Sequence, residues 1–381
     1  MKRKIAAFVV AGCFCLGHAI ANETGAKPPE LKSEQDKTPT VNPMFAKIWN
    51  MTKLSMLWYL TYSQGREEGN RFNKFHVGRG YVTVELEPVS WFEPRVTVDT
   101  HQNDEGDWSV RLKYLYGKFV LPMETSVISE PNIEAGLVHT PWFDYEENVN
   151  NYRMEDAMFI ERNQILNSAD LGVMVGGLIG KKLSKDYQER VSKKYPGKYG
   201  SFALGFYNGG GYHAKEQNND KVFMSRLSLR PLGFVLPHLQ VSYFFIFGKG
   251  NTKPTPDWYL HDVMLSFEYE YIVLTGQYAK GAGDQTGSKV NAAGEALDLQ
   301  GFSFFAEVKL PWIMSSIVGR FDYFDWDTNG SDPATSRLIA GYAFHFYKQN
   351  FLLLSMDRVS YEDPNHPTDW QGKLTLQVKL P

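Results

Sequence analysis

Alternation of apolar and polar side chains, repeated along most of the chain, is the feature that most limits the fold. Residues 82–86 (VTVEL) place Val and Leu on one face and Thr and Glu on the other, and residues 373–380 (KLTLQVKL) repeat the pattern. Period-two alternation predicts β-strands with one dry face and one wet face. Beyond residues 1–21, no apolar stretch reaches the roughly 18 residues of a transmembrane helix. The sequence therefore excludes a helical membrane protein.

Aromatic side chains are frequent for a chain with such a polar average. They make up 14% of the residues, with 25 Phe, 21 Tyr and 9 Trp, yet the mean hydropathy is −0.36. This combination fits strands that face lipid on one side and water on the other, with aromatic girdles at both membrane interfaces. A large soluble β-sandwich or lectin is the alternative.

Sixteen alternating runs predict an all-β fold: a closed antiparallel transmembrane β-barrel. The number is even, as in bacterial single-chain barrels, and most runs approach the roughly 9–11 residues that cross a bilayer at a tilt. Fourteen or eighteen strands stay open as alternatives, because boundaries read from sequence shift by about two to four residues. The candidate strands are residues 54–64, 79–88, 93–102, 108–120, 131–140, 169–180, 201–212, 222–232, 239–249, 259–269, 271–281, 301–311, 315–326, 336–347, 351–362 and 372–380.

The connections between these runs differ in length. Short connections include residues 88–92, 231–238, 311–314 and 348–350. Long, polar connections include residues 181–200, 212–220, 281–300 and 363–371. Short turns at one end and long loops at the other are typical of outer-membrane barrels. We therefore expect all four long segments at the same end of the barrel.

The N-terminus predicts export. Residues 1–21 combine a basic start, an apolar run over residues 5–16 and the Ala19-Ile20-Ala21 sequence, as in a cleavable signal peptide. A lipoprotein signal ending at Cys13 is the alternative reading. Both cysteines of the chain, Cys13 and Cys15, lie in this segment, so the mature protein is expected to contain no disulfide.

Two further regions follow the signal peptide. Residues 22–52 begin with a stretch rich in Lys, Glu, Pro and Thr that contains few large apolar side chains, which predicts a disordered periplasmic linker. Residues 53–381 are expected to form the barrel. The predicted location is the outer membrane of a Gram-negative cell.

Four stretches resemble the phosphate-selective porin O/P family. They are residues 76–85 (HVGRGYVTVE), 95–99 (RVTVD), 136–142 (GLVHTPW) and 158–162 (MFIER), and the resemblance covers about residues 75–180. It implies a sixteen-stranded barrel, usually trimeric, in which one long loop folds inward and narrows the pore. By position, residues 141–169 look like that loop.

The charges of this segment depart from the family pattern. Phosphate-selective members resemble one another in crowding Arg and Lys at the narrowest point, whereas this segment has six acids and two arginines. Phosphate selectivity therefore does not follow from the resemblance. A solvated external loop is the alternative to a constriction. The charged residues of the segment are Asp144, Glu146, Glu147, Arg153, Glu155, Asp156, Glu161 and Arg162, and the constriction candidates among them are Arg153, Glu155, Asp156, Glu161 and Arg162.

The strand pattern also predicts the lumen wall, because the face opposite the apolar face must meet water. The inward candidates are the basic residues Arg95, Arg111, Lys113, Arg226, Arg230, Lys309, Arg320, Arg337, Lys373 and Lys379 and the acidic residues Glu85, Asp99, Glu268, Glu270, Glu307, Asp322 and Asp357. The principal wall candidates are Arg95, Asp99, Arg111, Lys113, Arg226, Arg320 and Asp322. A slightly basic wall opposite an acidic loop would produce a transverse field and a weak ion preference.

We therefore expect a passive channel for small polar solutes or ions, anions such as phosphate among them. The expected partners are those solutes, the lipid bilayer, lipopolysaccharide and two further copies of the chain in a homotrimer. The net charge of −3 shows no basic excess, so nucleic acid is not expected. No cofactor is expected either.

Two other classes of function stay open. A phospholipase-like barrel enzyme would need a nucleophile near a base, and Ser266 with His261 is the least remote pair, although no Gly-x-Ser-x-Gly sequence is present. No metal site is expected, because His-x-x-x-His and Cys-x-x-Cys spacings are absent and residues 325–332 fall short of a calcium loop. A plugged structural or adhesive barrel is the remaining alternative.

Overall fold

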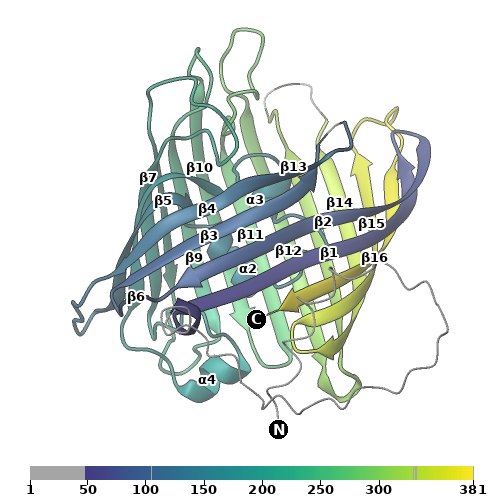
Figure 1. Ribbon diagram of the computed structural model, residues 1–381. Helices are drawn as coiled ribbons and strands as arrows, with labels where there is room; N and C mark the ends of the chain where they lie inside the picture. Colours follow the sequence, from purple (N-terminus) through teal and green to yellow (C-terminus); the bar gives the residue numbers. More distant parts are fainter. Residues whose placement is uncertain (1–47, 104, 329, 331–332, 381) are drawn as a thin grey trace, which may run out of the picture. The chain divides into compact units, whose positions relative to one another are not determined.

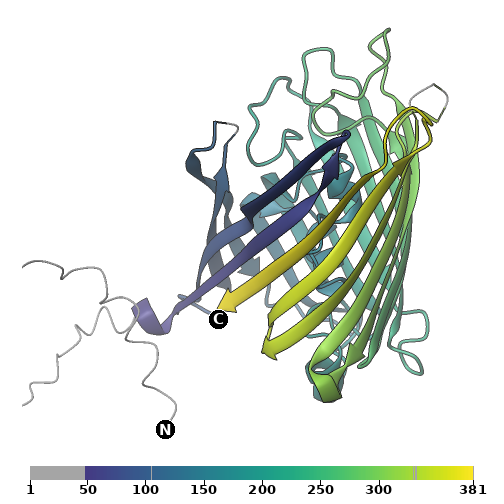
Figure 2. The ribbon, with the colours of Figure 1, turned by 90° about the vertical axis from the view of Figure 1, so that its right-hand side faces the viewer.

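The computed structural model describes residues 48–103, 105–328, 330 and 333–380. Sixteen strands form one closed antiparallel barrel in which each strand pairs with the next and β1 pairs with β16, so that the first and last strands run side by side (Figure 2). The predicted strand number and barrel closure are confirmed. The strands are β1 (Thr52–Glu67), β2 (Asn70–Leu86), β3 (Phe92–Gln102), β4 (Trp108–Val120), β5 (Ile128–His139), β6 (Ala169–Ile179), β7 (Gly200–Tyr207), β8 (Val222–Leu229), β9 (Leu239–Lys249), β10 (Asp257–Glu268), β11 (Ile272–Ala282), β12 (Asp298–Leu310), β13 (Ser315–Asp325), β14 (Thr335–Tyr347), β15 (Asn350–Tyr361) and β16 (Asp369–Leu380).

The alternation of side chains explains the two faces of the wall. In β10, Val263 and Leu265 are 45% and 50% exposed, whereas Asp262 and Ser266 on the other face of the strand are buried. The apolar residues therefore face outward and the polar ones face the interior, which is the reverse of a soluble barrel. The alternative of a soluble β-sandwich or lectin is excluded by the closed single sheet.

The two ends of the barrel differ, and one expectation about them is wrong. The end where β1 starts and β16 finishes has mostly short turns, which we call the turn end; the opposite end is the loop end (Figure 1). Residues 180–199, which contain helix α4 (Lys185–Arg190), lie at the turn end and not with the other long segments. A strand's place in the chain order decides the end at which its connection lies, and the polar composition of a connection carries no such information.

The loop end also contains one very short connection. Glu68 and Gly69 join β1 to β2, and both have a positive φ, of 47° and 80°. Such a two-residue turn matches the twist of long paired strands. β1 and β2 are accordingly 16 and 17 residues long, and β2 begins nine residues before the strand expected from residue 79.

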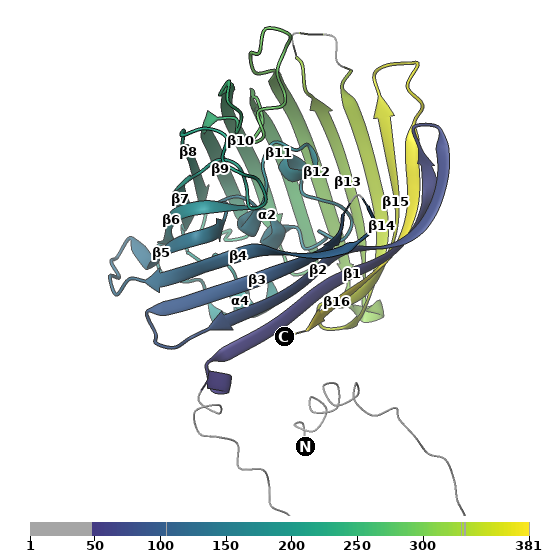
Figure 3. The ribbon, with the colours of Figure 1, turned by 45° about the horizontal axis from the view of Figure 1, so that its top comes forward.

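The loop of residues 140–168 lies inside the barrel. It contains the short helices α2 (Phe143–Val149) and α3 (Phe159–Arg162), and Figure 3 shows α2 within the ring of strands. Trp142 and Phe159 are fully buried, and their rings lie 5.2 Å from that of Phe244 and 5.7 Å from that of Phe324. The predicted inward fold is confirmed, and the alternative of a solvated external loop is wrong. None of the helices in the described part of the chain is long and apolar enough to cross a membrane.

Candidate pore constriction

The first half of the loop is shaped by an amphipathic helical turn. In α2, Phe143, Tyr145 and Val149 are buried, and the acidic Asp144 and Glu146 lie in the first turn, where the helix dipole favours negative charge. Tyr145 accepts a hydrogen bond on its hydroxyl oxygen from Ser242 Oγ of β9 at 2.8 Å. The helix therefore faces the β8–β9 wall with both apolar and polar contacts.

Three basic wall residues hold the loop by its backbone. Arg226 Nε donates to the Pro141 carbonyl and Arg320 Nη1 to the Ala157 carbonyl, each at 2.9 Å, and Lys373 Nζ donates to the Glu155 carbonyl. These side chains are 1%, 4% and 7% exposed. Arg226 and Arg320 are therefore loop anchors, a role that the strand pattern did not predict.

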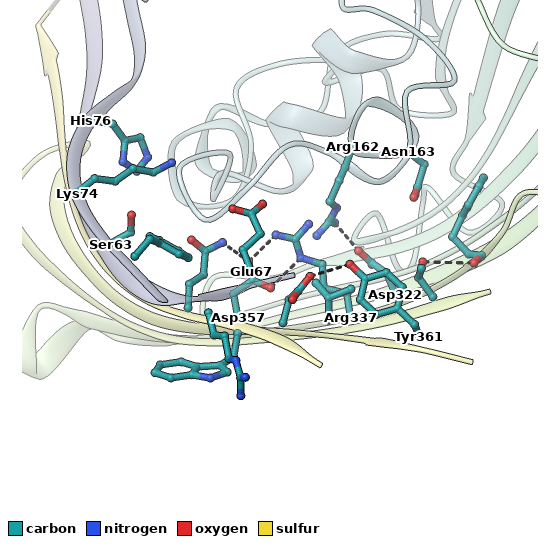
Figure 4. A pocket seen from close by; sticks show the side chains of 18 residues that line it. Ser63, Glu67, Lys74, His76, Arg162, Asn163, Asp322, Arg337, Asp357 and Tyr361 are labelled. Atoms are coloured by element: carbon teal, nitrogen blue, oxygen red, sulfur yellow. Dashed lines mark hydrogen bonds and ion pairs between the residues drawn. The ribbon is translucent and has the colours of Figure 1, made fainter. Parts of the chain in front are cut away.

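Ion pairs connect the second half of the loop to the wall of β13–β15. Arg162 pairs with Asp322, and Asp156 pairs with Arg337, which also pairs with Asp357 at 2.5 Å. Figure 4 shows Arg162 beside Asp322 and Arg337 beside Asp357. These contacts join two predicted constriction residues, Asp156 and Arg162, to residues that were all predicted to face inward from the wall.

Arg153 forms a second set of pairs at the tip of the loop. Its guanidinium group lies 2.7 Å from a carboxylate oxygen of Glu161 and 3.1 Å from one of Glu147. Glu147 also lies 3.5 Å from Arg79 of β2. Three of the six acids of the loop, Glu147, Asp156 and Glu161, thus pair with arginines, so the loop contributes less negative charge than its sequence suggests.

Two glutamates of the loop are buried without such pairs. Glu155 is 1% exposed, and neither of its carboxylate oxygens has a hydrogen-bond partner in the described structure. Burial raises the pKa of Glu155 to about 7, although Arg320 and Lys373 oppose the shift. Burial likewise raises the pKa of Glu146 to about 7 against the effect of Arg320. Both carboxyl groups are poised to change charge near neutral pH.

The predicted wall residues of β3 and β4 lie farther round the barrel, with β2, β1 and β16 between β3 and β15. Arg111 pairs with Asp99 at 2.9 Å, and Arg95 lies 3.6 Å from Glu85. Lys113 is 2% exposed, donates to the Tyr81 hydroxyl, and lies 4.6 Å from the centre of that ring. This wall combines cations with tyrosine rings.

Arg79 is a functional candidate that the sequence analysis missed. It lies on β2, is 7% exposed, and its guanidinium carbon lies 4.7 Å from the centre of the Tyr81 ring. Its position has the same parity as that of Glu85, which was predicted to face inward, so the alternation contained the signal. The strand expected over residues 79–88 began at Arg79, but Arg79 was not among the residues predicted to face inward.

Two of the cavities that border the loop lie against β1, β2 and β13–β16, and a third, of about 630 Å³, borders it at Asp144. The loop-end cavity, of about 490 Å³, has a balanced lining of four basic and four acidic side chains, together with His76. The turn-end cavity, of about 390 Å³, has five basic side chains and two acidic ones, together with His345. Both use β1, β2 and β13–β16 as walls, and Arg162 borders the first while Arg153 borders the second. The charged residues of the turn-end cavity are Arg79, Arg153, Lys309, Lys348, Lys379, Glu147 and Glu307.

The serine and histidine pair considered from the sequence does not meet. Ser266 is buried on the inward face of β10, whereas His261 contacts the exposed Tyr243 hydroxyl at 2.6 Å and faces outward. Positions an odd number apart in a strand lie on opposite faces, so this pair cannot act together.

Another serine and histidine do lie close together. Ser316 Oγ is 3.1 Å from His345 Nε2, but Ser316 donates to Glu307 at 2.8 Å. The carboxylate therefore contacts the serine and does not orient the imidazole, unlike the order of a hydrolase triad. Among the described residues, no group of three or more His, Cys, Asp or Glu side chains is placed to hold a metal ion.

Comparisons with known proteins give a likeness in structure but not in sequence. No family model matches the chain, and no curated protein matches it. An anion-selective porin from Comamonas acidovorans superimposes with a TM-score of 0.62 at 7% identity, covering 86% of this chain and 99% of that one. The likeness shows a shared fold.

Two other solved structures share this fold. Outer-membrane-expressed OmpT of Vibrio cholerae has a TM-score of 0.56 at 8% identity, covering 86% of this chain and 97% of that one. Salmonella typhi OmpF, solved as a complex with daunomycin, has a TM-score of 0.55 at 10% identity, again covering 86% and 97%. These structures thus share the closed β-barrel fold, which has sixteen strands in this chain.

Proposed function

We propose that the protein is an outer-membrane porin through which small polar solutes and ions diffuse passively. A closed barrel whose outer face is apolar and whose inward loop leaves a cavity on each side supports this function. Arg153, Glu155, Asp156, Glu161 and Arg162 would form the loop side of the constriction. The barrel would contact lipid and lipopolysaccharide after export by the signal peptide, whose residues lie outside the described part of the chain, as does most of the proposed linker.

We further propose a weak preference for anions such as phosphate. The observation that carries it is the turn-end cavity, where five cations meet only two carboxylates. Lys309 lies 3.9 Å from Glu307, whereas no ion pair holds Lys348 or Lys379 within the described residues. Unpaired cations at a pore mouth raise the local concentration of anions. The name of the Comamonas acidovorans porin agrees with this preference.

A homotrimer is the assembly that we propose. One similar structure, of OmpT from Vibrio cholerae, is described as a trimer form, with a TM-score of 0.54. Cross-linking of the purified protein in detergent, followed by sedimentation, would distinguish a trimer from a monomer.

Single-channel recording in a planar lipid bilayer tests the channel and its preference together. We expect discrete ohmic steps and a reversal potential of the sign that anion permeation gives across a salt gradient. Replacing Lys309, Lys348 and Lys379 together by Gln should lower the ratio of anion to cation permeability by about twofold. Lys249→Gln, which removes a cation at the loop-end rim, is the matched control and should change nothing. Absence of conductance from a folded barrel would contradict the porin proposal.

A further inference from the structure

Residues 180–199 form an arm at the turn end of the barrel. The segments that leave and re-enter the barrel are joined by backbone hydrogen bonds. Lys198 N donates to the Lys181 carbonyl at 2.8 Å, and Leu183 N donates to the Pro196 carbonyl at 2.7 Å. Helix α4 lies between these paired segments. The arm is therefore an ordered hairpin-like structure and not a simple turn.

A residue next to the barrel wall forms hydrogen bonds with the part of this arm that contains Tyr195. Arg230, which follows β8 and is 2% exposed, donates from Nη1 to the Gly197 carbonyl at 3.2 Å and to the Tyr195 carbonyl at 3.3 Å. Its Nε donates to the Pro237 carbonyl at 2.9 Å. Tyr195 itself has a φ of 53°, a conformation that few side chains adopt without surrounding contacts.

The arm contacts the inward loop through Asp144. The Tyr195 hydroxyl donates to Asp144 Oδ2 at 2.5 Å, and Lys194 Nζ lies 3.2 Å from Asp144 Oδ1. The Tyr195 ring lies 5.5 Å from that of Tyr145, and the Arg226 guanidinium group lies 4.4 Å from the Tyr145 ring centre and 4.8 Å from that of Tyr195. Arg226 also anchors the start of the loop, so arm, wall and loop meet at one point.

We propose that Tyr195 is a positioning residue for the pore constriction, acting through Asp144. The width of the passage is then set by two segments that enter the barrel from opposite ends, the loop of residues 140–168 and the arm of residues 180–199. The second half of the loop has its own ion pairs with β13–β15, whereas the charge on α2 that faces the turn end is held by the arm. This inference goes beyond the proposed anion preference, although its effect on conductance rests on the proposed channel.

Loss of the tyrosine hydroxyl should release α2. Burial disfavours the charged form of Asp144, but Lys194, His139 and the Tyr195 hydroxyl outweigh it and hold the pKa of that carboxyl well below its usual range. Removing a hydrogen bond to a buried charged group leaves its desolvation poorly compensated. The helix then gains stability by moving Asp144 toward water, which loosens the start of the loop.

The test compares Tyr195→Phe and Asp144→Asn with Tyr187→Phe. Tyr187 lies in the same arm, and its hydroxyl donates to the Pro237 carbonyl and accepts from Arg230 Nη2, each at 3.4 Å. Tyr187→Phe is therefore the control for a change beside Arg230 that leaves the contact of Tyr195 with Asp144 in place. Amide hydrogen exchange of residues 143–149 in the detergent-solubilised protein should become about tenfold faster or more in Tyr195→Phe. Exchange at residues 159–162 should stay unchanged, and Tyr187→Phe should match the wild type.

Channel recordings give a second readout. Tyr195→Phe and Asp144→Asn should both increase the frequency of brief closures. The double variant should behave like Asp144→Asn alone, because that change already removes the contact with Tyr195 together with the ion pair to Lys194. Unchanged exchange of α2 in Tyr195→Phe overturns the inference, as does faster exchange throughout the loop in the control. Because Tyr195→Phe retains the ring, it decides the matter even where Asp144→Asn fails to fold. Hydrogen exchange of α2 is measured without any channel current. A protein that does not conduct would therefore contradict the porin proposal and leave the test of Tyr195 intact.

Discussion

The two halves of the inward loop differ in the polar contacts that hold them to the wall. The first half packs Trp142 on Phe244 and Tyr145 against β9, with Arg226 bound to a backbone carbonyl. The second half also buries Phe159 and Ile160, and it adds ion pairs that reach β13–β15. Apolar burial depends little on salt and pH, whereas charge pairs next to water respond to both. The comparison suggests a fixed first half and a second half that is adjustable by solution conditions.

The largest effect is expected where the first half is most buried. Trp142→Ala removes a ring that is 0% exposed, so the free energy of unfolding in urea, measured in detergent micelles by tryptophan fluorescence and circular dichroism, should fall by about 3–5 kcal/mol. Trp91→Ala is the control, because Trp91 is 55% exposed, and its loss should cost less than about 1 kcal/mol. Equal losses would mean that the loop does not contribute to barrel stability.

A smaller effect is expected from the second half. Arg337→Gln leaves Asp156 and Asp357 without their shared guanidinium group and should cost about 2–3 kcal/mol, because water reaches the pair and screens it. The reversal potential should also shift toward cation permeation, since two carboxylates lose their nearest counter-charge and keep only Arg162 at 3.9 Å and Lys373 at 3.5 Å. Arg358→Gln is the control. Arg358 follows Asp357 in β15 and is exposed, so its replacement should alter neither the free energy of unfolding nor the reversal potential. A stable, equally anion-permeable Arg337→Gln protein would contradict the role of ion pairs in the second half.

The strands could be predicted from the sequence, whereas the contacts inside the lumen could not. Alternation is a property of each strand alone, so sixteen strands and their inward faces followed from residues such as those of 373–380. What fills the lumen depends on contacts between distant segments, and neither the anchoring role of Arg226 nor the contact of Tyr195 with Asp144 leaves a local pattern.

The wrong expectation about the end of the barrel at which residues 180–199 lie has a related cause. Residues 180–199 are long and rich in lysine, as a loop-end segment often is, and only the count of preceding strands places them at the turn end. The early start of β2 was not predicted because residues 70–76 are mostly polar, although they pair in register with β1. In both cases composition favoured one structure and pairing with a neighbour decided another.

The smallest effect, and the sharpest test of an adjustable second half, concerns pH. Glu155 has an ordinary pKa near 4.5 that burial raises to about 7 in the folded protein. A carboxyl with a raised folded pKa contributes stability that is fully present below pH about 4.5 and is lost as the pH rises through about 7. The loop should therefore be most ordered in mild acid, and brief closures should become more frequent between pH 5 and pH 8, for a change of roughly 1–2 kcal/mol. Glu155→Gln, which cannot ionise, should flatten this dependence and keep the acid behaviour at pH 8, whereas Glu105→Gln, at the connection between β3 and β4, should keep the wild-type profile. If Glu155→Gln titrates like the wild type, the pH response belongs to another group, and Glu146, whose pKa is also raised to about 7 in the first half of the loop, is the next to replace. A response traced to Glu146 would reverse the assignment of the adjustable half.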